Sequence, residues 1–246
     1  MIVGFVGSGN MAAAMARGWS GEFEGMLFSD SGSGRAQALA EELGEEVASN
    51  EEIARRADLV VVAVKPGKLD EVAPELREAK EVLSVLAVVS LERLQSLFPG
   101  AEHVLRAMPN VGVEVRRGVL CVAGSLSAEA RAKLDLLGHV VEIADADFDQ
   151  ATALMGCAPA YLALVVEALA DAGAEAGFDP ELARELVVET TAGTAELLRR
   201  HSPAEVRKTV TSPGGSTEAG LEALDREGAR QAFKAAVEAS LKRMRG

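Results

Sequence analysis

The chain has 246 residues, of which 48% are hydrophobic, and its formal net charge is -13. This length and composition are sufficient for one large globular domain or two ordinary ones with hydrophobic cores. The acidic balance leaves no basic stretch that would follow a phosphate backbone or an anionic lipid surface, so we expect neither nucleic acid nor a membrane as a partner.

The remaining composition excludes other classes of site. Cys121 and Cys157 lie in unlike surroundings, which favours buried thiols in a reducing compartment over a disulfide framework. The histidines are isolated from one another, so we expect no metal site. The apolar start "MIVGFV" is too short for a signal peptide, and we expect no run that approaches the roughly 18 apolar residues of a membrane span. We therefore expect a soluble, cytoplasmic protein.

Short β-branched runs alternate with helix-like segments through residues 1–145. Such alternation predicts an α/β fold with a parallel sheet and crossover helices. The apolar residues 59–64 show no period-two alternation, which is typical of a central strand that is covered on both faces. The candidate strands are residues 1–6, 25–29, 57–64, 81–89, 103–108 and 118–124.

The stretch "GFVGSGNMAAAMARG" follows the first candidate strand and opens a helix. Gly7, Gly9 and Ala12 fill the G-x-G-x-x-G/A frame of a dinucleotide-binding turn. Gly7 allows the tight turn, Gly9 allows the backbone to approach a pyrophosphate, and Ala12 allows the helix to pack on the strand. The free N–H groups and the dipole of the helix would hold the phosphates. We predict a Rossmann dinucleotide site, and a strand–helix turn without a ligand is the alternative.

The second candidate strand ends in "FSDSGSGRA", about twenty residues after Gly9, where the ribose contact is expected. Asp30 favours NADH, because a carboxylate accepts hydrogen bonds from the ribose diol and repels a 2′-phosphate. Ser31, Ser33 and Arg35 favour NADPH, because hydroxyls and a guanidinium suit that phosphate. A further alternative is that Asp30 or Ser33 only caps the next helix. We predict NADPH, with NADH possible.

Residues 146–246 are rich in Ala, Leu and Glu and predict an all-helical second domain. In the segment Pro159–Gly177 the charged Glu167, Asp171 and Glu175 lie on one narrow stripe, and apolar residues cover most of the remaining circumference. Such a helix must be buried on several sides, and a domain of about one hundred residues cannot easily surround it. We therefore expect a dimer that forms through this domain. Enclosure of the helix by its own domain is the alternative.

The stretch "VTSPGGSTEAGL", residues 210–221, places a proline and two glycines within the helical half. A helix that begins near Gly214 or Gly215 would present free N–H groups from Gly215, Ser216 and Thr217 and hydroxyls from Ser212, Ser216 and Thr217. These groups predict an anion pocket built from the backbone. A helix–helix turn with a serine cap is the alternative.

Five stretches in chain order carry a resemblance to a known family: "GSGNMA" at the start, "AVKP" at 63–66, "RAMPN" at 106–110, "PAYLALVVEALADAG" at 159–173 and "TSPGGST" at 211–217. With them the sequence resembles the pyrroline-5-carboxylate reductases, which catalyse the last step of proline biosynthesis. The resemblance implies a Rossmann domain, here residues 1–145, and an all-helical substrate-binding and dimerisation domain, here residues 146–246. It also implies a homodimer or a larger ring.

The reaction that this resemblance implies is hydride transfer from NAD(P)H to a cyclic imine, giving L-proline. Because the protonated imine is already an electrophile, we expect catalysis by positioning, without a catalytic side chain or a metal. The expected substrate-binding residues are Ser212, Gly214, Gly215, Ser216 and Thr217, of which Thr217 matches the family threonine that contacts the substrate. The expected cofactor-binding residues are Gly7, Ser8, Gly9, Asn10, Met11, Ser31, Ser33, Arg35, Asn50, Ala63, Val64, Lys65, Pro66, Met108, Pro109 and Asn110.

Several positions depart from the family pattern. Val111 and Gly112 replace Thr-Pro, Val88 replaces a glycine, and Glu218 stands where an apolar residue is common. The other departures are Met155, Cys157 and Ala158, in place of Ser, Ser and Gly. They leave two alternatives: a reductase of another cyclic imine, or a non-catalytic nucleotide-binding paralogue with a regulatory role.

Overall fold

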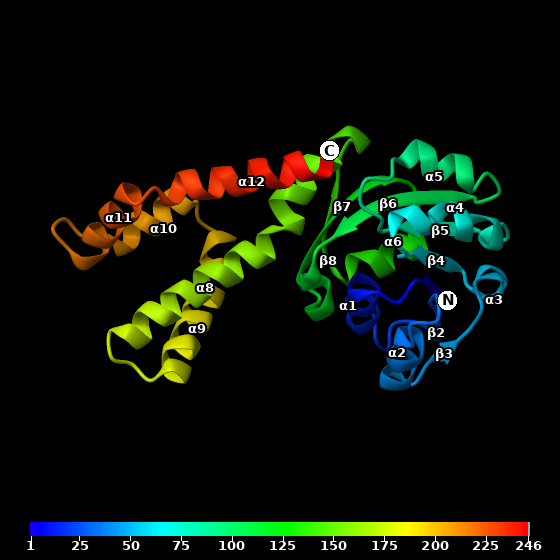
Figure 1. The fold of residues 1–246 in the computed structure, drawn as a ribbon, viewed down its shortest axis with the longest axis horizontal. Coiled ribbons are helices and arrows are strands. Elements are labelled where there is room, and N and C mark those ends of the chain that lie inside the picture. Colours follow the sequence, from blue (N-terminus) through cyan, green and yellow to red (C-terminus); the bar gives the residue numbers. More distant parts are fainter. Residues whose placement is uncertain (246) are drawn as a thin grey trace. The chain divides into compact units, whose positions relative to one another are not determined.

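The β-branched runs of the first half form one sheet, in the strand order β3-β2-β1-β4-β5-β6-β7-β8 (Figure 1). This structure is a computed structural model, and it describes residues 1–245. All neighbouring strands are parallel except β6 and β7, which pair antiparallel. The strands are β1 (Ile2–Val6), β2 (Gly25–Ser29), β3 (Glu46–Val47), β4 (Leu59–Val62), β5 (Glu81–Ser84), β6 (His103–Pro109), β7 (Gly118–Gly124) and β8 (Gly138–Glu142).

The predicted α/β class is confirmed, with three differences in the strands. The sheet is not wholly parallel, because β7 runs against β6. Strands β3 and β8 were not among the candidates: β3 has two residues, both exposed, and β8 has no fully buried residue. The candidate strand over residues 81–89 ends at Ser84, and the chain then turns at Ala87 and Val88.

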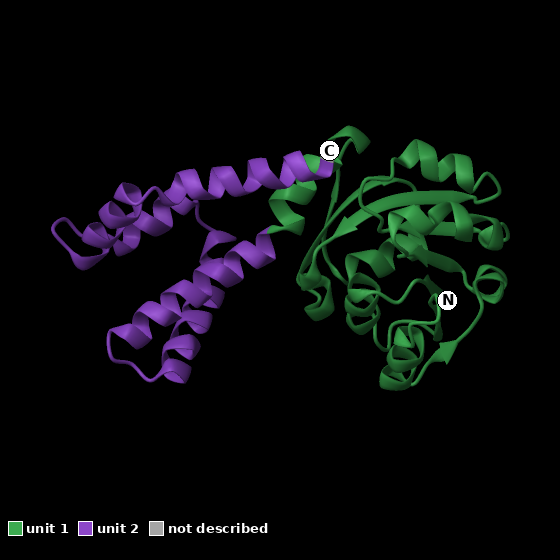
Figure 2. Cartoon of the chain, in the orientation of Figure 1, with its two compact units in different colours: residues 1–157 green, residues 158–246 purple. Residues whose placement is uncertain are grey.

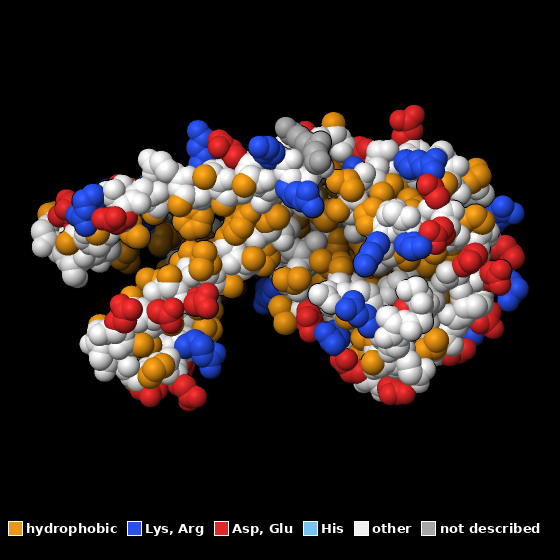
Figure 3. All heavy atoms as spheres, in the orientation of Figure 1, with side chains coloured by type: hydrophobic (Ala, Val, Ile, Leu, Met, Phe, Trp, Pro, Cys, Tyr) orange, Lys and Arg blue, Asp and Glu red, His pale blue; other side chains and the backbone are white. Residues whose placement is uncertain are grey.

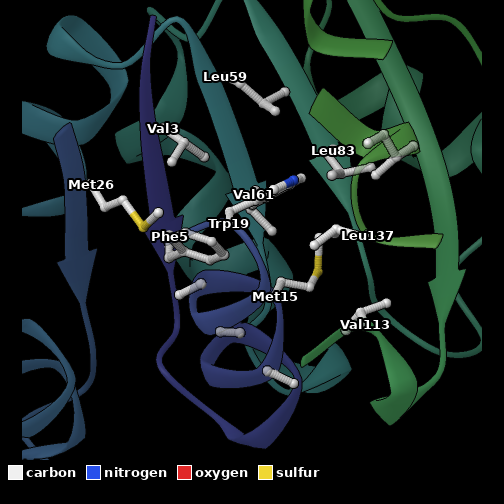
Figure 4. Close-up of a cluster of buried hydrophobic side chains, with 14 of the residues drawn as sticks. Val3, Phe5, Met15, Trp19, Met26, Leu59, Val61, Leu83, Val113 and Leu137 are labelled. Carbon is white, nitrogen blue, oxygen red and sulfur yellow. The ribbon is translucent and has the colours of Figure 1, made fainter. Parts of the chain in front are cut away.

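Two hydrophobic clusters cover the two faces of the sheet. Alternation along β1 directs Val3 and Phe5 into one cluster and Val6 into the other. Figure 4 shows the first cluster, in which Phe5 packs beside Trp19, the residue that follows α1. The Phe5 ring also stacks on that of Phe28, with a centroid distance of 5.2 Å. All four residues of β4 are buried, as predicted for a central strand.

The helices of this half connect the strands and supply the rest of both clusters. The α-helices are α1 (Asn10–Gly18), α2 (Arg35–Leu43), α3 (Asn50–Arg56), α4 (Leu69–Val72), α5 (Leu91–Leu97), α6 (Ala128–Asp135) and α7 (Phe148–Ala151). Shorter turns are η1 (Pro66–Lys68), η2 (Ala73–Leu76), η3 (Val111–Val115), η4 (Asp145–Asp147) and the π-helical η5 (Thr152–Gly156).

The chain divides into two compact units, Met1–Cys157 and Ala158–Gly246 (Figure 2). The second unit is wholly helical. Asp179 accepts hydrogen bonds from the first amides of α9, and Ser202 forms a capping box with Glu205 at the start of α10. Its helices are α8 (Ala158–Glu175), α9 (Pro180–Leu198), α10 (Pro203–Val210), α11 (Ser216–Arg226) and α12 (Ala229–Arg245).

The second unit leaves most of its apolar side chains exposed. Helix α8 has no buried residue, and Leu162 and Leu164 are 59% and 62% exposed. Figure 3 shows hydrophobic side chains gathered along this unit. Within the unit, Tyr161 of α8 lies 2.6 Å from Ser240 of α12, through their hydroxyl oxygens. The alternative that α8 is enclosed by its own domain is therefore wrong.

One expectation about membrane spans is also wrong. The helical segment Asp145–Glu175 is long and apolar enough to cross a membrane by length and composition alone, with a mean hydropathy of 1.8. Pro159 does not end this segment, because proline is tolerated in the first turn of α8, which begins at Ala158 after a bend at Cys157. An apolar helix that packs on another subunit has the same length and hydropathy.

Candidate functional site

The glycine-rich turn after β1 has the geometry that the sequence predicts. Gly7 has a φ of +96°, which favours glycine. A Cβ on Gly7 would stand 2.7 Å from the backbone carbonyl of Ala63, so the turn packs directly against the chain that leaves β4. The Gly7 amide donates to the carbonyl of Ser29, and the Ser8 hydroxyl donates to the same carbonyl. Strands β1, β2 and β4 thus fix this turn.

Helix α1 begins directly after this turn with no side-chain cap. Gly9 is the N-cap residue, its backbone is extended, and a Cβ at Gly9 would meet no atom within 4 Å. The first amides of the helix, from Asn10 and Met11, have no intrahelical partner. Ala12 is fully buried against the sheet. This uncapped helix start, with open space over Gly9, fits a bound anion such as a pyrophosphate.

The carboxylate of Asp30 is engaged within its own loop. It accepts hydrogen bonds from the Gly32 amide at 2.7 Å, the Ser33 hydroxyl at 2.7 Å and the Ala36 amide at 3.0 Å. The bond from Ala36, followed by that from Ser33, lowers the pKa of Asp30 to about 2. Asp30 thus accepts from an amide in the first turn of α2, as the capping alternative requires of it. A carboxylate with three donors has little capacity left for a ribose diol.

Ser31 and Arg35 are exposed on the same loop. Arg35 is the first residue of α2, whose N-cap Gly34 has a φ of +77° and offers no side-chain cap. The start of α2, where Asp30 accepts from the Ala36 amide, therefore lies beside a hydroxyl and a guanidinium. This combination fits a phosphate group.

Other expected cofactor residues surround these two helix starts. Asn50 accepts a hydrogen bond from the Ser29 hydroxyl at 2.5 Å and donates to Glu75 at 2.6 Å, which orients its amide at the start of α3. The segment Ala63–Pro66 leaves the carboxyl end of β4, where the Ala63 amide donates to the Val6 carbonyl. It lies beside β1, where the strand order reverses, which is the place for a dinucleotide in open α/β sheets.

The carboxyl end of β6 is held by Asn110. Its side-chain oxygen accepts from the Val119 amide at 3.1 Å, and its side-chain nitrogen donates to the Met155 carbonyl at 3.2 Å. Met108 is buried. Two departures from the family pattern follow Asn110 in the chain. Val111 is exposed, and a Cβ on Gly112 would stand 3.0 Å from the Arg117 carbonyl. Glycine at position 112 thus permits a tight turn where the family has a rigid proline.

The predicted break in the helical half is a helix start of the same kind as α1. Helix α11 begins at Ser216, its N-cap is Gly215, and there is no side-chain cap. Gly214 has a φ of +73°. Ser212 packs closely on Gly215, because a Cβ there would stand 2.5 Å from the Ser212 hydroxyl oxygen. Thr217 and Ser216 are exposed at the helix start. The expected helix boundary is confirmed.

One departure from the family pattern, Glu218, lies in the first turn of α11. The carboxylate of Glu218 accepts a hydrogen bond from the Gly214 amide at 2.7 Å. A carboxylate of the chain itself therefore occupies one of the backbone donors that would face an anionic ligand. The serine cap of the helix–helix-turn alternative is absent, whereas Glu218 does lie in the first turn of α11, as that alternative expects.

Two features of the first unit were not recognised from the sequence. Val88 has a φ of +57°, although valine is β-branched, and its departure from a family glycine was the signal that pointed there. The segment with Met155 forms the π-helical turn η5, and Cys157 caps it while Ala158 starts α8. Within residues 1–245, no group of three His, Cys, Asp or Glu side chains is placed to hold a metal.

Comparison with protein-family models identifies both halves of the chain. Residues 145–246 match the model described as pyrroline-5-carboxylate reductase dimerisation. Residues 2–90 match the model described as NADP oxidoreductase, coenzyme F420-dependent.

Comparison with known proteins gives matches along most of the chain. The pyrroline-5-carboxylate reductase of Synechocystis is 39% identical over 206 residues, which cover 79% of this chain and 76% of that protein. The crystal structure of 1-pyrroline-5-carboxylate reductase from Streptococcus pyogenes is 31% identical and superposes with a TM-score of 0.87 over 99% of this chain and 98% of that one. The pyrroline carboxylate reductase of Plasmodium falciparum with NADP bound is 27% identical, with a TM-score of 0.84 over 99% and 97%.

Proposed function

The chain belongs to the pyrroline-5-carboxylate reductase family, and we propose from this premise that it reduces pyrroline-5-carboxylate to L-proline with NADPH. The observation that carries the proposal is the match to proteins of that name along both units. A Rossmann unit alone supports many reductions, so the helical unit is what narrows the substrate. NADPH is the coenzyme because the first unit matches an NADP oxidoreductase model and a similar structure holds NADP.

The chemistry needs little from side chains. Bound NADPH supplies a hydride. The protonated ring nitrogen makes the imine carbon electrophilic, so hydride addition moves the C=N electron pair onto nitrogen and gives the secondary amine of proline. The chain has to hold a dinucleotide and an anionic ring in register. Both tasks fall to glycine-led helix starts, at Gly9 and at Gly215.

The cofactor residues that we propose follow the geometry of the first unit. Residues 7–11 hold the pyrophosphate through the uncapped start of α1. The segment Ala63–Pro66 lines the same crevice, Asn50 lies on its adenosine side, and residues 108–110 border the nicotinamide. Asn110 supports this border by its hydrogen bonds to Val119 and Met155, so its side chain acts through the backbone that it fixes.

The loop around Asp30 is proposed to bind the 2′-phosphate of NADPH. Ser31 and Arg35 supply the hydroxyl and guanidinium, and Ser33 shapes the loop by its bond to Asp30. Arg35→Ala should weaken NADPH about 10-fold or more and leave NADH nearly unchanged, because a charge-assisted contact to the phosphate is lost. Equal losses of affinity for the two coenzymes, measured by calorimetric titration, would remove Arg35 from the 2′-phosphate site.

The substrate residues that we propose lie at the start of α11. The amides that follow Gly215 and the hydroxyls of Ser212, Ser216 and Thr217 bind the substrate carboxylate, because a helix start offers free donors and a positive dipole end. Gly214 contributes its amide when Glu218 releases it. No carboxylic acid or histidine is required at this end of the site.

The chain associates with itself and acts on a small molecule. We propose a homodimer, or a larger ring built from dimers, that forms through residues 146–246. The exposed apolar side chains of α8 support this proposal, since they would remain in water in a single chain. The same packing explains the apolar segment Asp145–Glu175 without a membrane. We also propose a cytoplasmic enzyme without a nucleic-acid partner, in keeping with the net charge of -13.

The test of this function is a coenzyme assay with substrate. The protein is mixed with pyrroline-5-carboxylate and NADPH, then NADH, and the loss of nicotinamide absorbance is followed with proline quantified as the product. We expect substrate-dependent oxidation of NADPH with one proline for each NADPH consumed. Binding of NADPH without oxidation would instead support the regulatory paralogue, and oxidation with a different cyclic imine only would change the substrate.

A further inference from the structure

The turn between β5 and α5 holds a residue with a strained backbone. Val88 has a φ of +57° and is 56% exposed. A β-branched side chain rarely adopts this conformation, because its Cβ substituents crowd the backbone. Arg116 is the other residue of this kind in residues 1–245, and its guanidinium donates to the Gly18 carbonyl at 2.7 Å. The side chain of Val88 has no hydrogen-bonding group that could offset the strain in this way.

The residues on both sides of Val88 are anchored. Leu86 and Val89 are buried in the second hydrophobic cluster. The Val85 amide donates to the Val62 carbonyl at the end of β4, at 3.1 Å. The tip with Ala87 and Val88 therefore stands at the carboxyl edge of the sheet, next to the strand that precedes the segment Ala63–Pro66.

The far end of this turn is held by a distant carboxylate. Asp145 accepts a hydrogen bond from the Leu91 amide, the first amide of α5, at 3.2 Å. The other oxygen of Asp145 accepts from the Arg106 guanidinium of β6 at 2.8 Å. Arg106 is 4% exposed and lies over the Phe148 ring at 4.0 Å. Arg106 is therefore fixed inside the fold, and the half-buried carboxylate of Asp145 joins β6 to the end of the strained turn.

We propose that Asp145 is a positioning residue for the coenzyme: it clamps the start of α5 so that residues 85–90 keep Val88 in its strained conformation beside the nicotinamide half of the crevice. This inference rests on the proposed NADPH site. The physical reason is that strain persists only where the surrounding contacts over-determine the backbone. The contacts that do so are the buried anchors at Leu86 and Val89 and the bond from Leu91 to Asp145.

The Leu91 amide can be removed while both Asp145 and Arg106 are retained. Asp145→Ala would leave Arg106 unpaired in the interior and destabilise the whole unit. Leu91→Pro removes the amide donor together with the leucine side chain and should keep the helix, because Leu91 is the first helical residue after the N-cap Ser90, where proline is favoured. Ser90 has φ -71° and ψ 156°, a conformation that is compatible with a following proline. Leu91→Ala is the matched control, since it loses the side chain and keeps the amide.

The experiment measures the Kd for NADPH by calorimetry without substrate, so its result does not depend on turnover. Leu91→Pro should raise the Kd about 10-fold relative to Leu91→Ala, as expected for loss of one hydrogen bond to a charged group. Val88→Gly in the Leu91→Pro background should bring the Kd back to within about 3-fold of the control, because glycine adopts positive φ without a clamp.

A second measurement reports on the protein without coenzyme. Val88→Gly alone should raise the Tm by about 2 °C through relief of strain, and the rise should be smaller with Leu91→Pro, where the turn has already relaxed. Equal Kd values for Leu91→Pro and Leu91→Ala would overturn the proposal. So would a Kd for Leu91→Pro that Val88→Gly does not recover. Failure of the protein to reduce pyrroline-5-carboxylate would overturn the proposed function and leave these binding results intact.

Discussion

Helices α1 and α11 begin in the same way in very different surroundings. Each follows a glycine with an extended backbone and has no side-chain cap. The residues around α1 belong to a packed core, with Ala12 and Met15 fully buried. Helix α11 has no buried residue at all. The proposed dinucleotide site thus lies in a unit with its own packed core, whereas the proposed substrate site lies in a unit that leaves most of its apolar side chains exposed.

This contrast separates what each mutation should change. Substitutions at the start of α1 should alter coenzyme affinity in the isolated chain. Substitutions in the second unit should alter assembly or substrate use and leave the Kd for NADPH unchanged. The following experiments probe that division, beginning with the largest expected effect.

Alanine substitutions of Gly7 and Gly9 should both weaken NADPH binding, but for different reasons. Gly7→Ala should raise the Kd for NADPH by more than about 100-fold and also lower the Tm, because alanine cannot adopt a φ of +96° so close to Ala63 without strain. Gly9→Ala should raise the Kd by about 100-fold with little change in Tm, since its backbone is ordinary and only the space for the ligand is filled. Calorimetric titration and thermal unfolding measure both effects. A Gly9→Ala variant with normal affinity would remove this turn from the site.

Disruption of the apolar face of α8 should separate assembly from coenzyme binding. Leu164→Glu places a carboxylate on the proposed interface and should weaken self-association about 100-fold, because burial of an unpaired charge is costly. Sedimentation should show smaller particles and the assay a similar loss of turnover, while the Kd for NADPH stays constant. Leu136→Glu, at an exposed apolar position of the first unit, is the control. Unchanged assembly in Leu164→Glu would contradict an interface on this face.

The hydroxyl of Thr217 allows a direct test of the proposed substrate site. Thr217→Val should lower kcat/KM for pyrroline-5-carboxylate by about 10- to 150-fold, the loss expected for a hydrogen bond to a charged group. Thr217→Ser retains the hydroxyl and should recover most of the activity. The Kd for NADPH should not move in either variant. Activity of Thr217→Val equal to that of the unaltered enzyme would exclude Thr217 from the carboxylate site.

The smallest effect concerns the carboxylate that already occupies this helix start. Glu218→Gln keeps the length of the side chain and removes a negative charge next to the Gly214 amide. We expect the KM for pyrroline-5-carboxylate to fall about 2- to 4-fold, because one competing and repelling carboxylate is gone. A KM that rises would mean that Glu218 shapes the pocket more than it competes for it.

The sequence predicted most of the first unit and the local form of both helix starts. The structural roles of Gly7, Gly9 and Ala12 could be predicted, because each role depends on local backbone geometry. The ion pair between Arg106 and Asp145 joins residues far apart in the chain, and no local pattern encodes it. Edge strand β8 was missed because half-buried edges carry a weak periodic signal. The role of Asp30 could not be predicted, because an aspartate at the end of the second strand can either bind a ribose or cap the following helix.

The central claim is that these two differently built helix starts serve one reaction, with hydride passed directly from coenzyme to imine. The most direct test is isotopic: NADPH deuterated at nicotinamide C4, on each face in turn, is oxidised with pyrroline-5-carboxylate, and the proline formed is analysed by mass spectrometry. With one of the two labels, we predict proline that carries one deuterium at the former imine carbon. Unlabelled proline from both, or NADPH consumed without proline, would contradict the account.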